Sequence, residues 1–253
     1  MNKDMEVKRD IMDVCLLAGK IMLESGAETY RVEDTMMRIA RSFGIEESHS
    51  FVTPTGILFS FEIDDVISTK LTRISERTTD LQKVTMVNGI SRRISNGELT
   101  VEEAFHRLHE LQETSSPFTL PIKVAAASFS SGCFLIMFQG GWSDFIPAML
   151  AGGAGYLSLE YIHRLVAIKF FSEFMAALII GLVSYFFIWS TLGNELDKII
   201  IGSVMPLVPG LLLTNAVRDL MAGHLISGLA KGAEAFLTAL AIGSGIAVVL
   251  TLF

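Results

Sequence analysis

Cysteine is scarce in this sequence of 253 residues, which holds only Cys15 and Cys133. Two thiols this far apart give neither a disulfide framework nor the spacing of a metal site, so we interpret each as a buried structural thiol. A secretory leader is also missing, because the opening residues MNKDMEVKRDIMD alternate charged and apolar side chains and lack an apolar core. We therefore expect the N-terminal part of the chain to stay in the cytoplasm.

Several function classes have no pattern to support them. The basic residues form no tract, which argues against a nucleic-acid partner. His106 and His109 stand three apart on a predicted helix, but no carboxylate or thiol pattern completes a metal site. Ser130–Ser131 lies in an apolar run without a histidine partner, and there is no phosphate-binding glycine loop. We expect no catalytic residue, no metal and no cofactor, and hence no enzyme.

Charge is abundant only in the first half of the chain. Residues 1–116 contain 14 of the 20 Lys and Arg and 20 of the 27 Asp and Glu, which leaves 6 and 7 for residues 117–253. The mean hydropathy of the whole chain is nevertheless +0.50. This asymmetry predicts an α+β cytoplasmic domain over residues 1–116 and an α-helical transmembrane domain over residues 117–253.

The first domain shows helical and strand patterns in turn. Apolar residues at helical spacing predict four helices, and Thr100 with Glu103 provides the last of them with a capping box. Runs rich in β-branched and aromatic residues predict two strands, paired as a hairpin around residues 63–65, and residues 114–117 mark the end of the domain. The predicted helices run from Ile11 to Ser25–Gly26, from Tyr30 to Phe43–Gly44, over Asp80–Ser95 and over Val101–Glu113; the predicted strands cover Ser50–Glu62 and Val66–Ile74.

Five apolar stretches follow, each close to the roughly 20 residues that cross a bilayer core. The loops assigned to the cytoplasm contain Arg164, Lys169, Arg218 and Lys231, against Lys198 alone outside, which obeys the positive-inside rule. We predict a multi-pass inner-membrane protein, surrounded by lipid, with its N-terminal domain in the cytoplasm and its C-terminus outside. The predicted transmembrane helices cover about residues 118–138, 143–162, 170–190, 199–215 and 232–252.

Three carboxylates lie near the cytoplasmic ends of these stretches, namely Glu160, Glu173 and Glu234. Ionisable side chains are costly in lipid, so such residues usually face a bundle interior or water, and they are candidates for a substrate pathway. The alternative is that they snorkel to the interface. Small residues are dense over residues 151–155 and 241–245, where close helix packing is the default interpretation.

The fourth apolar stretch is interrupted by residues that break helices. Pro206 and Pro209 lack a backbone donor and Gly210 permits unusual dihedral angles, so we predict a break near mid-membrane. Transporters build substrate sites at such breaks, whereas a packing kink is the alternative.

Three polar residues follow the break on the predicted cytoplasmic side, and they complete the predicted substrate pathway. They are Asn215, Arg218 and Asp219. Arg218 could pair with Asp219 or Glu234, or attract an anionic substrate group. An ordinary interfacial ion pair is the competing interpretation.

Motifs in both domains resemble those of the threonine/serine exporter family. In the first domain they are ESGAETYRVE at Glu24–Glu33 and a PTGI-containing hairpin at Pro54–Ile57. In the second they are MPLVPG at Met205–Gly210 and RDLMAGHLISGLAKGAEA at Arg218–Ala235, so the resemblance covers nearly the whole chain. Residues 24–33 also have a purely structural explanation, in which Gly26 ends one helix and Glu28 caps the next.

The resemblance implies that this chain is the larger, five-span subunit of the split, two-protein form of the exporter. It implies a smaller multi-span membrane subunit as partner, use of the proton motive force, and export of threonine and serine or of C4 dicarboxylates such as succinate. A higher oligomer is compatible with the sequence. The competing interpretation is a membrane-anchored sensor or scaffold whose cytoplasmic domain binds a ligand or a protein, although an anchor needs neither a broken span nor buried polar residues.

Overall fold

The computed structural model describes residues 2–63, 66–114 and 118–252, which form two compact, mostly helical units. Unit 1 comprises residues 1–116 together with 211–232, and unit 2 comprises residues 117–210 together with 233–253. The helices are α1 (Asn2–Glu24), α2 (Thr29–Ser42), α3 (Leu81–Ser95), α4 (Val101–Glu113), α5 (Leu120–Met137), α6 (Phe145–Val166), α7 (Lys169–Trp189), α8 (Leu196–Val204), α9 (Gly210–Met221) and α10 (Leu225–Leu252); the strands are β1 (Ser48–Thr53), β2 (Gly56–Ile63) and β3 (Val66–Arg73).

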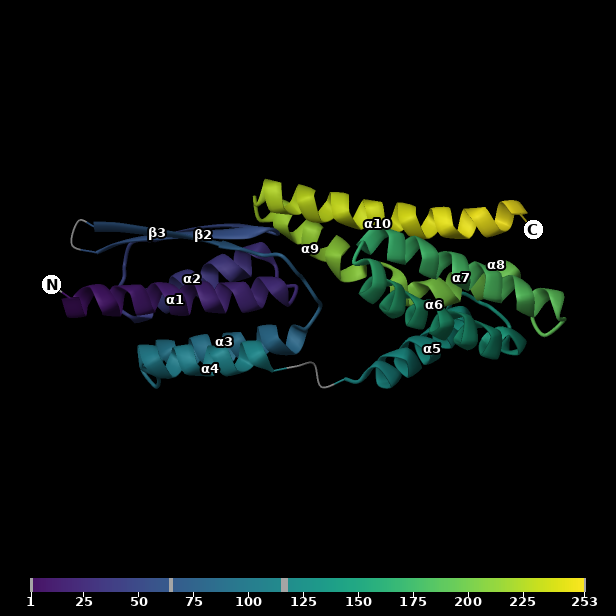
Figure 1. The fold of residues 1–253 in the computed structure, drawn as a ribbon, viewed down its shortest axis with the longest axis horizontal. Coiled ribbons are helices and arrows are strands. Elements are labelled where there is room, and N and C mark those ends of the chain that lie inside the picture. Colours follow the sequence, from purple (N-terminus) through teal and green to yellow (C-terminus); the bar gives the residue numbers. More distant parts are fainter. Residues whose placement is uncertain (1, 64–65, 115–117, 253) are drawn as a thin grey trace. The chain divides into compact units, whose positions relative to one another are not determined.

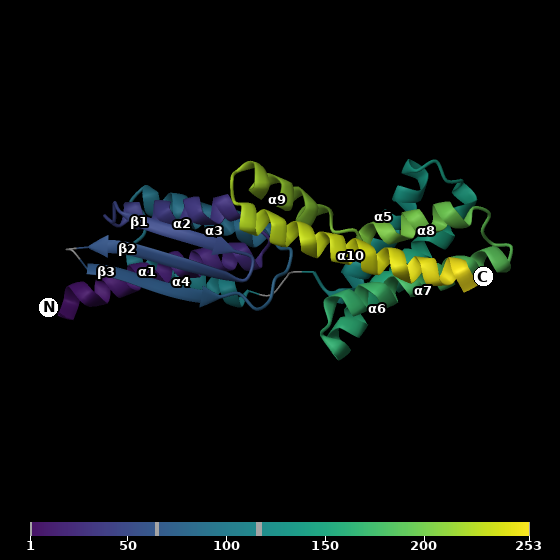
Figure 2. The ribbon, with the colours of Figure 1, turned by 90° about the horizontal axis from the view of Figure 1, so that it is seen from above.

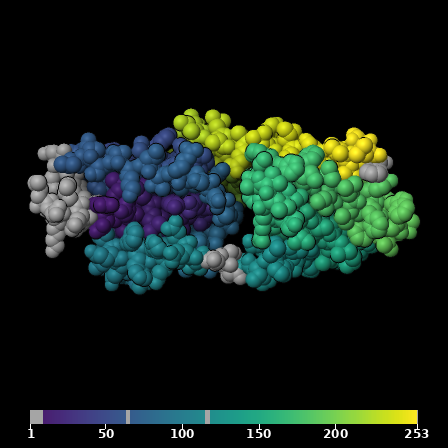
Figure 3. All heavy atoms as spheres, viewed as in Figure 1, coloured from purple at the N-terminus to yellow at the C-terminus, as the bar shows by residue number. Residues whose placement is uncertain are grey.

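The first part of unit 1 is layered. An antiparallel sheet in the order β1-β2-β3 covers one side of α1 and α2, and α3 and α4 lie on the other side (Figure 1). Ile57, Phe59 and Phe61 alternate along β2 and are all buried against the helices. In Figure 3 the purple atoms of α1 lie between the blue strands and the teal α3 and α4. Burial of each such side chain contributes about 1.5–3 kcal/mol, which makes this layer the core of the unit.

The four predicted helices of the first domain are confirmed, and so is the capping box at the start of α4. There Thr100 Oγ1 accepts from the Glu103 amide at 3.2 Å, and Glu103 Oε2 accepts from the Thr100 amide at 2.9 Å.

The strand prediction is partly wrong, because residues 50–62 form two strands and not one. β1 and β2 are joined by a two-residue turn at Pro54–Thr55, with Thr53 opposite Gly56. Proline cannot donate to a strand ladder and its fixed φ suits a turn, which explains the division. The predicted hairpin with Val66–Ile74 is confirmed by the antiparallel pair β2–β3. Its turn at residues 64–65 and the predicted domain end at residues 115–117 lie outside the described residues.

Unit 2 contains α5 to α8 and the C-terminal part of α10. Among the described residues, α5, α7 and α10 are long and apolar enough to cross a membrane, and α8 with α9 gives a fourth candidate if the bent pair is one span. The structure therefore has three or four candidate spans where the sequence predicts five. The remaining predicted span corresponds to α6, which has 22 residues and carries Glu160 and Arg164.

Small residues bring the helices of unit 2 close together. A Cβ atom on Gly245 of α10 would lie only 2.5 Å from the Phe174 carbonyl oxygen and 3.0 Å from Ala177 Cβ of α7. Gly152 of α6 packs in the same way against Ser131 of α5. Close packing is thus the observed use of both small-residue stretches.

The predicted break in the fourth apolar stretch is present. A 3₁₀ turn at Met205–Leu207 follows α8, and the segments Leu196–Leu207 and Gly210–Met221 are bent by 60° relative to each other. After the break, α9 and the first turns of α10 form a helical hairpin that belongs to unit 1 (Figure 2). The sequence places these residues in the transmembrane domain and does not predict that they pack with residues 1–116.

Candidate functional site

The junction between α1 and α2 presents the first turn of α2 to α9. Gly26 has a φ of +87° and ends α1, as predicted, because the left-handed conformation suits glycine. The backbone amide of Thr29 donates to Asp219 Oδ1 at 3.0 Å, and its hydroxyl donates to Asp219 Oδ2 at 2.8 Å. Asp219 therefore caps α2 and lies at the positive end of its dipole. Glu28 occupies the N-cap position of α2, as expected, but its side chain makes no capping hydrogen bond.

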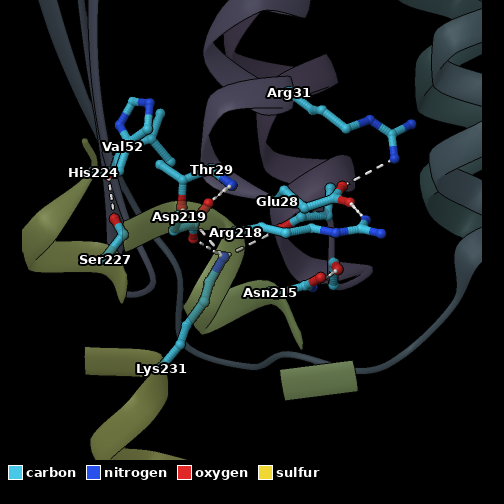
Figure 4. A network of polar contacts seen from close by, with 12 residues as sticks. Glu28, Thr29, Arg31, Val52, Asn215, Arg218, Asp219, His224, Ser227 and Lys231 are labelled. Carbon is cyan, nitrogen blue, oxygen red and sulfur yellow. Dashed lines mark hydrogen bonds and ion pairs between the residues drawn. The ribbon is translucent and has the colours of Figure 1, made fainter. Parts of the chain in front are cut away.

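Lys231 of α10 neutralises this buried carboxylate. Its Nζ lies 2.7 Å from Asp219 Oδ2, and the two side chains are 4% and 0% exposed. The same ammonium donates to Thr29 Oγ1 at 3.2 Å and to the Ala27 carbonyl oxygen at 3.4 Å (Figure 4). All three ammonium donors thus have acceptors, which is the condition under which a buried ion pair is tolerated.

A second set of charges lies at the rim of the same junction. Glu28 accepts from Arg218 of α9 at 2.6 Å and from Arg31 of α2 at 2.9 Å. Burial raises the pKa of Glu28, but its own backbone amide and the two guanidinium groups outweigh burial and hold that pKa below the ordinary value. The pairing of Arg218 with Asp219 or Glu234 that the sequence allowed is not observed. Arg218 and Asp219 are consecutive on a helix and so point in different directions.

The edge strand β1 is attached to α10 through its backbone. Ser227 donates to the Val52 carbonyl oxygen at 2.8 Å, and the Val52 amide donates to Glu33 Oε1 at 3.0 Å. His224 Nδ1 lies 3.8 Å from the other oxygen of Glu33. Burial raises the pKa of Glu33, with the charge of Asp219 acting in the same direction and the Val52 amide and His224 opposing it.

These contacts form one network, here called the α2–α9–α10 polar cluster. Asn215 completes it by donating from Nδ2 to the Gly26 carbonyl oxygen at 2.9 Å. Two of the motifs that carry the family resemblance, at residues 24–33 and 218–235, supply most of its members, so the fold brings the two together. The cluster consists of Glu28, Thr29, Arg31, Glu33, Asn215, Arg218, Asp219, His224, Ser227 and Lys231.

Two further predicted residues meet inside unit 2, between α7 and α10. Thr238 donates to Glu173 Oε1 at 3.2 Å, and Lys169 Nζ lies 2.7 Å from Glu234 Oε1 and 4.0 Å from Glu173 Oε1. The Glu173 side chain is only 9% exposed, and within the described chain its Oε2 has no hydrogen-bond partner. We call these four residues the α7–α10 carboxylate site.

The remaining predicted residues lie apart from both groups. Pro206 lies in the 3₁₀ turn and Pro209 follows it, while Gly210 begins α9 with open space around the position that a Cβ would take. Glu160 is on α6, where Arg164 lies 4.0 Å away one turn further along the helix.

Sequence reasoning found three members of the polar cluster but missed its centre. It treated Lys231 only as a loop charge and gave Thr29 no role, although both lie within the resemblance motifs. Among the described residues no group of three His, Cys, Asp or Glu side chains could hold a metal ion.

Several helices that are long and apolar enough to cross a membrane, with acidic and basic side chains paired between α7 and α10, define a multi-span membrane protein. The family model described as "Putative threonine/serine exporter" matches residues 13–253, and the chain belongs to that family. The family resemblance of the motifs is thereby confirmed.

The relatives divide into proteins of similar length and longer ones. "Probable succinate transporter subunit YjjP" of Escherichia coli (strain K12) is 27% identical over 98% of this chain and 96% of that protein. "Probable threonine/serine exporter" of Mycobacterium tuberculosis is 24% identical over 91% of this chain but 44% of that protein. "Threonine/serine exporter" of Corynebacterium glutamicum is 20% identical, with 93% and 50% covered. No solved structure matches the chain.

Proposed function

We propose that this chain is one subunit of a secondary-active exporter for small polar metabolites, with C4 dicarboxylates such as succinate as the first candidates and threonine or serine as the second. The proposal rests on how much of each relative's length this chain matches. The match to the protein named as a succinate transporter subunit extends over both chains, whereas the two threonine/serine exporters are about twice as long as the part that matches. The missing half would come from a smaller multi-span membrane subunit of the same family.

The proposed topology has five spans in the inner membrane. α5, α7, α10 and the bent pair α8–α9 are the candidates by length and hydropathy, and α6 with 22 residues is long enough to be the fifth. Residues 1–116 would lie in the cytoplasm and the C-terminus outside, in keeping with the distribution of Lys and Arg between the loops.

The α7–α10 carboxylate site is the proposed place of proton coupling. A buried carboxylate with one oxygen unpartnered is costly when ionised, so Glu173 is suited to gain and lose a proton as its neighbours move. Lys169, shared between Glu173 and Glu234, provides a neighbour whose position would decide which carboxylate is ionised. The break at Pro206–Gly210 would supply backbone groups for substrate.

The polar cluster of unit 1 has a positioning role in this proposal. Asn215, Arg218 and Asp219 are engaged by residues 26–31, so they are occupied by protein partners rather than open to substrate. Their contacts would hold the segment that follows the break in a fixed place.

Transport in inverted membrane vesicles tests this function. Vesicles that contain this chain and its small partner subunit should take up labelled succinate when a proton gradient is imposed, and vesicles with either chain alone should not. Glu173→Gln should abolish the gradient-driven part of uptake, whereas Glu195→Gln, at an exposed position of the same unit, should leave it unchanged. The proposal would be refuted if, for each of succinate, threonine and serine, vesicles with this chain took up as much substrate as vesicles without it.

A further inference from the structure

A polar groove runs between α2 and α3 in unit 1. It has a volume of about 490 Å³. Each helix lines it with four residues at the spacing i, i+3, i+4 and i+7, which is one continuous helix face. The lining residues are Arg31, Asp34, Thr35 and Arg38 from α2 and Thr85, Asn88, Gly89 and Arg92 from α3.

The groove is positively charged although the chain as a whole carries −7. Three guanidinium groups line it against a single carboxylate, that of Asp34. Arg38 pairs with this carboxylate, since its Nη1 lies 3.6 Å from Asp34 Oδ2, and it also donates to Ser91 Oγ at 3.1 Å and to Thr35 Oγ1 at 3.3 Å. Arg92 is exposed, and its side chain makes no hydrogen bond or ion pair within the described part of the chain. Guanidinium groups with unused donors are suited to carboxylate and phosphate oxygens.

Gly89 keeps the groove open. A Cβ atom at this position would meet no atom within 4 Å, so no helix packing requires a glycine there. A glycine inside a helix is less stable than an alanine, and here the missing side chain leaves space between the arginines.

We propose that this groove binds a small anion with two or more negative charges, of the di- or tricarboxylate or phosphorylated-metabolite class. A second groove, of about 470 Å³ between α1 and α4, is lined by several acidic side chains and has the opposite charge. The anion would therefore select the α2–α3 groove.

The groove is connected to the polar cluster through Arg31. This residue lines the groove and also donates to Glu28, which in turn accepts from Arg218 of α9. An anion that draws Arg31 into the groove weakens one of the two guanidinium contacts of Glu28. Anion binding would thus weaken the contact that attaches α9 to Glu28. An effect of the anion on export rests on the proposed function, whereas the binding itself does not.

Calorimetric titration of the purified full-length protein with succinate, citrate and pyrophosphate, at constant ionic strength, tests the binding. At least one of these anions should bind, and acetate, with a single charge, should bind at least about 10-fold more weakly. Arg92→Ala and Gly89→Met should each weaken binding by about 10-fold or more, the first by removing a donor and the second by filling the groove. Arg107→Ala, at an exposed position of α4, should leave it unchanged. Absence of binding by all three anions overturns the proposal, and so does wild-type affinity in both Arg92→Ala and Gly89→Met.

Export measured with the same variants separates this inference from the proposed function. If export proceeds normally and no anion binds, the groove proposal fails and the exporter stands. If Arg92→Ala loses both anion binding and the response of export to that anion, the groove is regulatory. If it loses binding while export responds as before, the connection through Arg31 is refuted.

Discussion

The buried ion pair between Lys231 and Asp219 can be tested by removing only its cation. Lys231→Met keeps a long apolar side chain but leaves the fully buried Asp219 carboxylate without a counter-charge. Removing one partner of a buried pair costs about 3–5 kcal/mol. Because Asp219 keeps both hydrogen bonds from Thr29, we expect the lower end of that range. Local opening at the start of α2 should then be favoured by a factor on the order of 100.

Hydrogen exchange of the full-length protein in detergent measures this opening directly. The amide of Thr29 is protected by Asp219, so peptides that cover residues 27–33 should exchange on the order of 100-fold faster in Lys231→Met. The double variant Asp219→Asn with Lys231→Met removes both charges and retains an oxygen acceptor for Thr29. It should therefore recover most of the protection.

A matched control is Lys20→Met on α1. Lys20 forms a partly exposed pair with Glu24 at 3.9 Å, which is worth less than about 1 kcal/mol, so protection should not change at residues 27–33. Two results would show that the buried charge pair does not attach α9 and α10 to α2. One is a wild-type exchange rate at residues 27–33 in Lys231→Met, and the other is a double variant whose residues 27–33 exchange as fast as those of Lys231→Met.

Three further predictions concern other parts of the two units. The pKa of Glu33 is raised in the folded protein, so the stability that its protonated form contributes is fully present below the unfolded pKa of about 4.3 and is lost as pH rises through the folded pKa. In urea titrations at a series of pH values, Glu33→Gln should remove this decrease in the free energy of unfolding. Gly245→Ala should lower the free energy of unfolding by about 1–3 kcal/mol, because the added Cβ meets the backbone of α7. Gly243→Ala has open space around the added Cβ and should be neutral or slightly stabilising. Arg218→Ala should cost only about 1 kcal/mol in the exchange assay, because Arg218 is 57% exposed and Glu28 keeps Arg31; a loss as large as that of Lys231→Met would contradict this ranking.

The site was predictable in part, and the reason lies in the distance over which each signal acts. The capping box of Thr100, the helix end at Gly26 and the break at Pro206–Gly210 depend on neighbours within one helical turn, so the sequence displays them. The strand division at Pro54–Thr55 was also local: the hairpin motif at Pro54–Ile57 marks it, although the β-branched and aromatic residues on both sides favoured one long strand.

By itself, the sequence determined the division into a polar and an apolar part, the helices of residues 1–116, the broken fourth stretch and the family. Only the tertiary structure decided which charges are partners, because Glu28 and Arg218 are 190 residues apart and no periodicity relates them. Solvation explains the difference. A charged side chain has a desolvation cost only when folding removes it from water. The group that offsets this cost is the one that helix packing places beside it. The sequence predicts Lys231 as a cation in a cytoplasmic loop, whereas the fold buries it beside Asp219 at the centre of the cluster.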